Sequence, residues 1–173
     1  MTAQRVFLDA NVIIESFRIN VWTSLAQAWS LETVQKCEEE ALTGQTSRPG
    51  KVIVDPILLR AGLKASHPVG RAERNKLIAA HPACATMDAG EKDLFAYLYS
   101  LPQPLPALIV VSTADKGAIV RAKDVAWLDR LISLEELLSK TGAAKSSVAD
   151  LGQQYTSAFL GSVRTQVLMG VIP

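Results

Sequence analysis

The sequence contains few of the residues that staple small secreted domains or build zinc clusters. Its 173 residues include only two cysteines, Cys37 and Cys84, and these do not form a Cys-x-x-Cys pair. A disulfide framework or a cysteine-based zinc site is therefore not expected, and two isolated thiols fit the reducing cytoplasm.

Long apolar runs and a strong net charge are also absent. No stretch approaches the ~18 apolar residues of a membrane span, and the first five residues do not resemble a secretory signal. We therefore expect a cytoplasmic protein without membrane contact. The net charge is only +1, so any nucleic-acid surface must be a local patch. The 49% hydrophobic content favours a packed core, and the length suits one domain with a terminal extension.

Short apolar runs alternate with helical patterns along most of the chain. The expected strands are 6–8, 51–54, 108–111 and 125–128, while 31–34 fits either a short strand or a helix start. The expected helices begin at Asn11 and cover 21–29, 71–80, a segment from Asp88, 114–122 and 134–139. This alternation predicts an α/β fold, three-layer α/β/α, with a central parallel sheet.

The last part of the chain has a different pattern. Beyond a small-residue linker at 141–144, apolar residues recur at a spacing of four, as on one helical face: Leu151, Tyr155, Phe159, Val163 and Val167. We therefore expect a domain at 1–140 and a C-terminal linker and amphipathic helix at 141–173. The pattern does not show whether that helix packs on its own domain, a second copy or a partner.

Four acidic motifs occur in order along the expected domain. Asp9 follows the first strand, Glu38-Glu39-Glu40 lies in a helical pattern, Glu91 and Asp93 open an apolar helix, and Asp115 follows the strand at 108–111. Open parallel sheets build their sites at the carboxyl ends of strands. Converging carboxylates there repel one another, and Mg²⁺ or Mn²⁺, which prefer oxygen ligands, would relieve that repulsion.

Each acid also has a purely structural interpretation. Asp9 could cap the following helix, and Asp115, Glu91 and Asp93 are favoured in a first helical turn by the helix dipole. Three consecutive glutamates point in three directions around a helix, so most of them face solvent, and periodicity does not separate Glu38 from Glu39.

Taken in order, the motifs resemble those of the PIN-domain family of metal-dependent ribonucleases. Phe7-Leu8-Asp9-Ala10-Asn11 resembles the first motif, and Ser112-Thr113-Ala114-Asp115 the fourth. The stretch 33–39 is similar to the second motif, whose spacing selects Glu39. The stretch 89–96 resembles the third, in which Asp93 is preferred and Glu91 is the alternative. The resemblance covers about residues 5–139.

This resemblance implies a sheet of about five strands, one or two Mg²⁺ or Mn²⁺ ions and endonuclease cleavage of single-stranded RNA. Its implied metal ligands and catalytic acids are Asp9, Glu39, Asp93 and Asp115. Asn11, Ser112 and Thr113 would support them. Many family members are toxins of toxin–antitoxin pairs, so an antitoxin-like protein and a homodimer are implied partners.

A basic region accompanies the acids. Residues 48–76 carry seven cations and two anions, a local charge of +5, which suits a phosphate-tracking groove as well as an ordinary solvated surface. The candidate RNA-binding residues are Arg48, Lys51, Arg71, Arg74 and Lys76.

Two other functions fit parts of the sequence. The same fold could be a catalytically silent module that binds RNA or protein, with its acids serving only as helix caps. A phosphoryl-transfer enzyme of another α/β family fits less well, because the chain has no P-loop, no GxGxxG after a strand and no Asp-x-Asp at Asp9.

Overall fold

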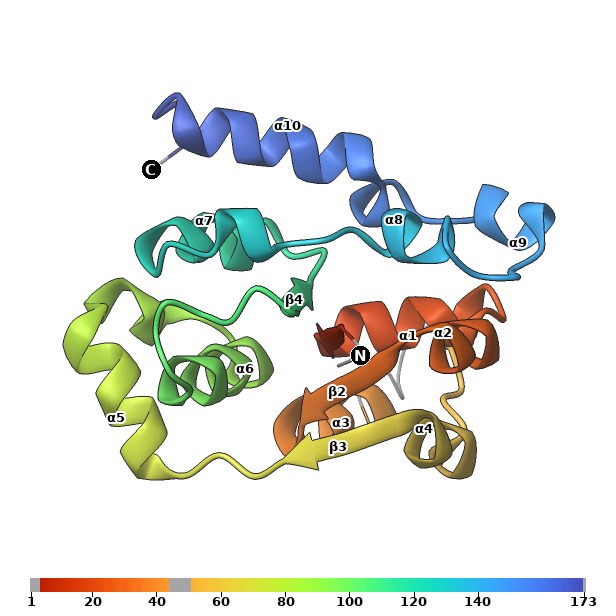
Figure 1. Ribbon diagram of the computed structural model, residues 1–173, viewed down its shortest axis with the longest axis horizontal. Coiled ribbons are helices and arrows are strands. Elements are labelled where there is room, and N and C mark those ends of the chain that lie inside the picture. The colour runs from red at the N-terminus through yellow and green to blue at the C-terminus, as the bar shows by residue number, and fades with distance from the viewer. Residues whose placement is uncertain (1–3, 44–50, 173) are drawn as a thin grey trace.

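The computed structural model describes residues 4–43 and 51–172, and it has an α/β architecture. Four parallel strands, in the order β3-β2-β1-β4, form a central sheet with helices on both faces (Figure 1). The strands are β1 (Arg5–Leu8), β2 (Ser30–Val34), β3 (Leu63–His67) and β4 (Ile109–Ser112). The predicted fold class is confirmed, with four strands in place of about five.

The helices follow the strands in a regular alternation. Those of the first half are α1 (Ala10–Arg18), α2 (Trp22–Ala28), α3 (Gln35–Thr43), α4 (Pro56–Gly62) and α5 (Arg71–Ala80). Those of the second half are α6 (Ala89–Ser100), α7 (Lys116–Asp124), α8 (Leu134–Leu138), α9 (Lys145–Ala149) and α10 (Ser157–Leu168). Within the described residues, no helix has both the length and the apolar character needed to cross a bilayer.

Alternating side chains of the strands fill two hydrophobic cores. Phe7 and Val111 face a core that contains residues of α5, α6 and α7, whereas Val6, Leu8 and Val110 face one shared with α1, α2 and α8. This two-residue period is the ordinary consequence of the pleat. Both faces of β1 and β4 are buried, so their sequences read as continuous apolar runs.

The predicted strand at 51–54 is wrong, and the strand β3 was not predicted. Ile53 is largely exposed, and the chain runs without regular structure to Asp55, whose side chain accepts hydrogen bonds from the backbone N–H groups of Ile57 and Leu58. This cap starts α4 at Pro56. The edge strand β3 contains Lys64 and Ser66 and is only partly buried, so it lacked an apolar signal.

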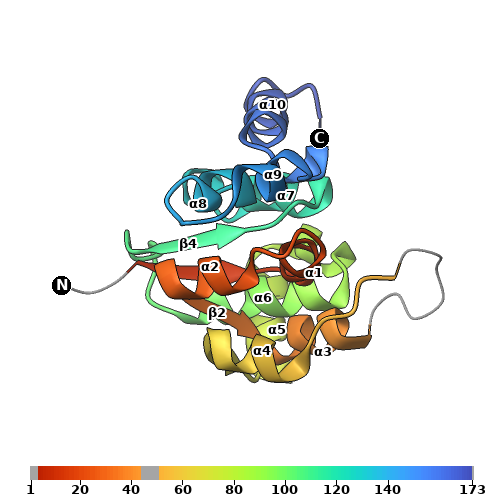
Figure 2. The ribbon, with the colours of Figure 1, turned by 90° about the vertical axis from the view of Figure 1, so that its right-hand side faces the viewer.

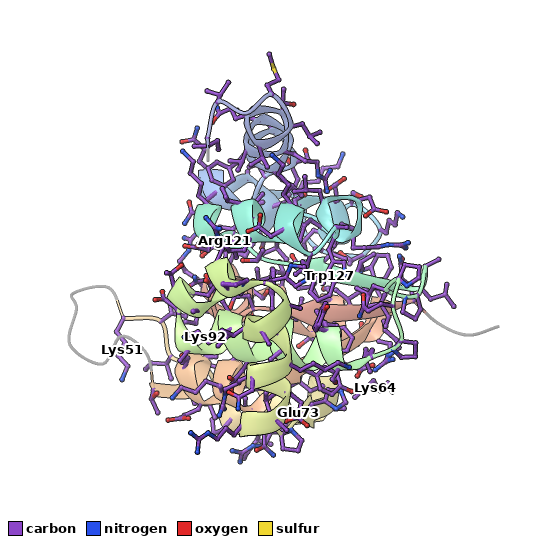
Figure 3. All side chains as sticks on the ribbon, turned by 90° about the vertical axis from the view of Figure 1, so that its left-hand side faces the viewer. Lys51, Lys64, Glu73, Lys92, Arg121 and Trp127 are labelled. Atoms are coloured by element: carbon purple, nitrogen blue, oxygen red, sulfur yellow. The ribbon has the colours of Figure 1, made fainter. Side chains whose placement is uncertain are left out.

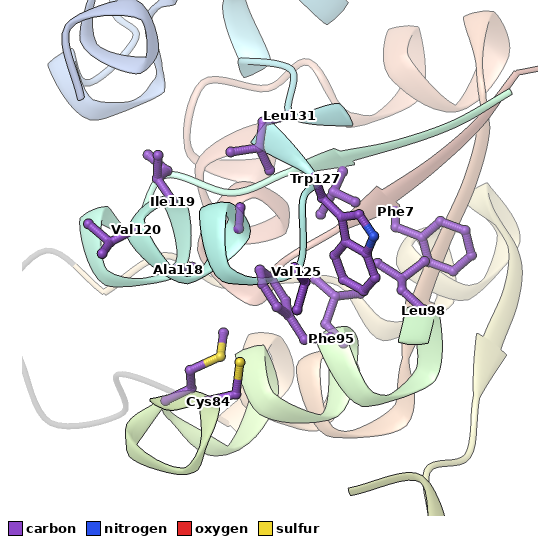
Figure 4. Close-up of a cluster of buried hydrophobic side chains, with 14 of the residues drawn as sticks. Phe7, Cys84, Phe95, Leu98, Ala118, Ile119, Val120, Val125, Trp127 and Leu131 are labelled. Atoms are coloured by element: carbon purple, nitrogen blue, oxygen red, sulfur yellow. The ribbon is translucent and has the colours of Figure 1, made fainter. Parts of the chain in front are cut away.

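The predicted last strand at 125–128 is also wrong. Trp127 is buried against Phe95 and donates its indole N–H to Gln103 at 3.3 Å (Figure 4). The backbone turns sharply at Ala126, where φ is +59°, and only Leu131 reaches the sheet, in a parallel bridge to Val111. The apolar residues Val125 and Trp127 are buried in the core beside α6 and lie in the turn after α7, so their apolar run is explained without a strand.

A buried charge network ties β1, β2 and β3 together. Arg5 donates two hydrogen bonds to Glu32, at 2.6 and 2.9 Å, and His67 Nε2 lies 2.6 Å from the second Glu32 oxygen. Burial acts to raise the pKa of Glu32, but the hydrogen bonds from Arg5 and His67 outweigh it and hold that pKa below its usual value. The His67 ring also stacks on Tyr97 of α6, with 4.1 Å between ring centroids.

The C-terminal segment is not one continuous helix. Leu151 and Tyr155 lie before Thr156, which caps α10 by accepting a hydrogen bond from the Phe159 backbone N–H. Figures 1 and 2 show α10 as an outer layer beyond α7 and α8. Its residues Leu160 and Val163 belong to the core that contains Phe7, so the tail packs on its own domain.

We predict that Leu160→Ala lowers the free energy of unfolding by about 2–5 kcal/mol, because it leaves a cavity between α10 and the core. Urea unfolding followed by circular dichroism measures this. Leu168→Ala on the same helix is the control, since that side chain is 68% exposed and its loss should change the stability by less than about 0.5 kcal/mol. Equal effects of the two substitutions would contradict the docking of α10.

Candidate functional site

Asp9 is the most deeply buried acid at the carboxyl edge of the sheet. It follows β1 directly, its side chain is 2% exposed, and one oxygen accepts a hydrogen bond from the Ala10 backbone N–H at 2.7 Å. Asp9 therefore caps α1, as its position after a strand allows. Burial raises the pKa of Asp9 to about 6, and the charges of Asp115 and Glu40 act in the same direction.

Thr113 joins Asp9 to Asp115. Its hydroxyl donates to the second Asp9 oxygen at 3.1 Å and accepts from the Asp115 backbone N–H at 3.2 Å. Asp115 is the N-cap of α7, since its Oδ1 accepts a hydrogen bond from the Ala118 backbone N–H at 2.9 Å. The first and fourth motifs thus meet because β1 and β4 are adjacent parallel strands that end level with each other.

Glu91 is the acid of the third motif that reaches this site. It lies in the first turn of α6 and is 8% exposed. Burial raises the pKa of Glu91 to about 8, and the charges of Asp9, Asp115 and Asp88 contribute further. Asp93 is placed elsewhere, because Arg74 binds both of its oxygens in a bidentate pair. Glu91, the alternative from the sequence, lines both depressions, whereas Asp93, the preferred residue, lines neither.

In the second motif Glu40 faces the site, whereas Glu38 and Glu39, the two residues considered from the sequence, do not. Glu39 is exposed and pairs with Lys36 at 3.1 Å, while Glu38 pairs with Arg60 at 2.8 Å. Glu40 accepts a hydrogen bond from the Gly90 backbone N–H at 3.1 Å, and burial raises its pKa. A Cβ at Gly90 would run into the Glu40 carboxylate, which explains the glycine at this position.

Two adjoining depressions open over these acids. The first, of about 160 Å³, is lined by Asp9, Ala10, Asn11, Ile14, Glu40, Asp88 and Glu91. The second, of about 210 Å³, is lined by Thr86, Met87, Asp88, Glu91, Asp115, Gly117 and Arg121. Asp88 and Glu91 belong to both, so Glu91 stands between two halves of one acidic site. Larger hollows elsewhere on the surface contain fewer acids and lie away from this edge.

The remaining predicted residues occupy varied positions. Asn11 is exposed at the rim of the first depression. Ser112 is fully buried, and its hydroxyl has no hydrogen-bond partner within the described part of the chain. Among the predicted RNA-binding residues, Arg74 is held by Asp93, Lys76 lies over the Tyr99 ring, and Lys51 and Arg71 are exposed. None of these four lines either depression, and Arg48 lies outside the described residues.

The donor set suits Mg²⁺ or Mn²⁺ in kind, because every acidic side chain at the site offers oxygen ligands. Burial is the main cause of the raised pKa values of Asp9 and Glu91, and repulsion between the acids, which a cation would relieve, adds to it. It is not preassembled in the described ranges, 4–43 and 51–172, where no group of three or more His, Cys, Asp or Glu side chains is close enough to hold an ion. Both Asp9 oxygens are engaged in protein hydrogen bonds. A bound ion would need side-chain movement, chiefly of Glu91, Asp88 and the second oxygen of Asp115.

Sequence reasoning missed Glu40, Asp88 and Arg121. Glu40 belongs to the recognised glutamate triplet, but only the packing of α3 against α6 shows which of the three faces inward. Asp88 takes the N-cap position of α6 without making a side-chain cap bond, so its carboxylate remains directed to the depressions. Arg121 carried no motif signal. The three comparisons with known proteins found no matching family model, no matching curated protein and no matching solved structure.

We predict that Glu91→Gln raises the free energy of unfolding at pH 8.5 by roughly 1–3 kcal/mol and has no stabilising effect near pH 4. The folded-state pKa of Glu91, about 8, lies above its ordinary value of 4.5, so folding favours the protonated form. The wild-type protein therefore loses stability as the pH rises from about 4.5 through 8, and glutamine escapes that loss.

Urea unfolding at a series of pH values measures this effect. Glu39→Gln is the matched control, because it removes the same charge from an exposed position on α3. A pH-independent difference between Glu91→Gln and the wild type would contradict the assignment of Glu91 to the buried acidic site.

Proposed function

We propose that this protein is a Mg²⁺- or Mn²⁺-dependent endoribonuclease that cleaves single-stranded RNA with a metal-activated water. The observation that supports it most strongly is the gathering of Asp9, Glu91 and Asp115, from three separated motifs, at the carboxyl edge of a parallel sheet. If the acids served only as helix caps, there would be no reason to bury Glu91 among other acids, where its pKa is near 8.

In this proposal Asp9, Glu91 and Asp115 hold the metal, with Asp88 and Glu40 at the rim of the shell. A metal ion held by these acids would supply Lewis-acid chemistry, by lowering the pKa of a water and offsetting charge on the scissile phosphate. The residues of the chain have separate tasks. Thr113 fixes the separation of Asp9 and Asp115, and the Gly90 backbone N–H orients Glu40. No side-chain nucleophile is required.

The resemblance to PIN-domain proteins extends this proposal to a toxin with an antitoxin-like protein partner, acting in the cytoplasm. That extension depends on the motifs alone. A homodimer is likewise proposed from the resemblance. The proposed substrate, single-stranded RNA, also comes from the resemblance.

A catalytically silent binding module is the second candidate. Asp9 and Asp115 both act as helix caps, and in the described residues the acids do not form a ready ion site. The effect of Mn²⁺ on stability distinguishes the two functions. A silent module gains no stability from Mn²⁺, whereas a protein that binds Mn²⁺ in its folded state becomes more stable as the Mn²⁺ concentration rises above the dissociation constant.

We predict that Mn²⁺ raises the melting temperature and supports cleavage of a mixed-sequence single-stranded RNA, and that EDTA abolishes both effects. Asp9→Asn and Glu91→Gln should each lower the cleavage rate at least ~100-fold, because each removes a charge that holds the ion. Glu39→Gln should cleave like the wild type. Absence of both Mn²⁺ stabilisation and cleavage in a folded wild-type protein would sink the nuclease and favour the binding module.

Asp93→Asn tests whether Asp93 has a structural or a catalytic role. Its loss of the bidentate pair with Arg74 should destabilise the fold by about 1–3 kcal/mol, while cleavage per folded molecule stays within about threefold of the wild type. A large loss of cleavage in the folded variant would instead return Asp93 to the catalytic set.

A further inference from the structure

Among the described residues, Arg121 is the one cation that lines the second depression, where it shares the wall with Asp88, Glu91 and Asp115. Its side chain is 26% exposed, and its ion pair with Asp124 uses Nη1 at 2.9 Å. Nε and Nη2 of the guanidinium make no hydrogen bond within the described residues. A partly buried, planar fork with two free donors beside a group of acids is suited to bind a planar or tetrahedral anion.

The local sequence of α7 directs Arg121 toward the acids. Helical side chains lean toward the helix N-terminus, which here is capped by Asp115. Gly117, one turn before Arg121, lies on the same helix face and in the same depression. A Cβ at Gly117 would lie 2.9 Å from Asp115 Oδ1, so a side chain at this position would displace the Asp115 carboxylate.

An acidic pocket by itself repels a nucleic-acid strand. A strand enters only if its phosphate charge is met by a cation at the entry side as well as by a metal ion. The predicted basic residues of α5 do not fill this role, because none of them lines a depression and Arg74 is already paired. Figure 3 shows Arg121 of α7 on the same side of the molecule as Lys92 of α6.

We propose that Arg121 is a phosphate-binding residue of this site, which holds a phosphate of a single-stranded nucleic acid next to the one at the acids. The inference rests on the proposed function and names the entry path of its substrate: across α7 at Gly117 and Arg121, and not along α5. The bond is a bidentate contact from Nε and Nη2 to two phosphate oxygens. The exposed pair with Asp124 holds the guanidinium in place before the substrate arrives.

The test compares Arg121→Gln and Arg121→Lys with the control Arg130→Gln. Arg130 also has a local ion pair, with Asp129 at 3.4 Å, and lines neither depression, so the control removes the same charge elsewhere. Steady-state cleavage of a fluorescein-labelled single-stranded RNA of mixed sequence gives KM and kcat. Binding of the same RNA to Asp9→Asn proteins carrying each substitution gives the salt dependence, and a DNA strand of equal length distinguishes RNA from any phosphodiester.

Arg121→Gln should raise KM about tenfold, leave kcat within about threefold, and reduce the slope of log K against log salt by about 0.7, the contribution of one phosphate contact on a single strand. Arg121→Lys should restore the salt slope but only part of KM, because a point charge cannot make the bidentate contact. Stabilisation by Mn²⁺ should be unchanged in both. RNA and DNA should lose affinity equally, since the contact is to phosphate.

The outcomes separate this inference from the proposed function. If the wild type cleaves and Arg121→Gln has the KM and salt slope of Arg130→Gln, the role of Arg121 is overturned and the nuclease stands. If the wild type binds RNA without cleaving it and Arg121→Gln weakens that binding, the role of Arg121 stands and the nuclease falls. If the folded wild type neither binds nor cleaves, both are overturned.

Discussion

The hydroxyl of Thr113 connects the two strand ends on which the acidic site depends. It donates to Asp9 and accepts from the Asp115 backbone N–H, so a single side chain sets how far apart these acids lie. The arrangement requires β1 and β4 to be neighbours in register, which the pairing of Leu8 with Ser112 provides. Every other acid at the site approaches this fixed pair from α3 or α6.

Burial raises the pKa values of Asp9, Glu40 and Glu91 at this edge of the sheet. Five carboxylates line the two depressions, and two of them, Asp9 and Glu91, have pKa values raised to about 6 and about 8. Burying like charges together lowers the stability of the fold, and strongly shifted pKa values cluster at functional sites of proteins. Glu32 is the contrast, because Arg5 and His67 bind its carboxylate and lower the pKa of Glu32.

The C-terminal segment bears on the site through α7. Helix α10 packs on α7, and α7 carries both Asp115 and Arg121. A second anchor lies on α1, where the buried Glu15 accepts a hydrogen bond from the Gly152 backbone N–H at 2.7 Å. The tail therefore contacts the two helices that Asp9 and Asp115 cap, and its apolar residues divide between the two cores.

The sequence by itself determined the parts of the molecule that depend on local chemistry. Continuous apolar runs specified β1 and β4, caps and periodicity specified α5 and α6, and an aspartate after each of two strands indicated the edge where acids gather. Tertiary structure decided the rest, because rotation about a helix axis and pairing across the sheet are not local properties. The packing of α3 on α6 directs Glu40, and not Glu38 or Glu39, toward the site. Arg74 pairs with Asp93, so Glu91 is the acid of α6 at the depressions. Trp127 packs against Phe95 in the core and does not lie in a strand.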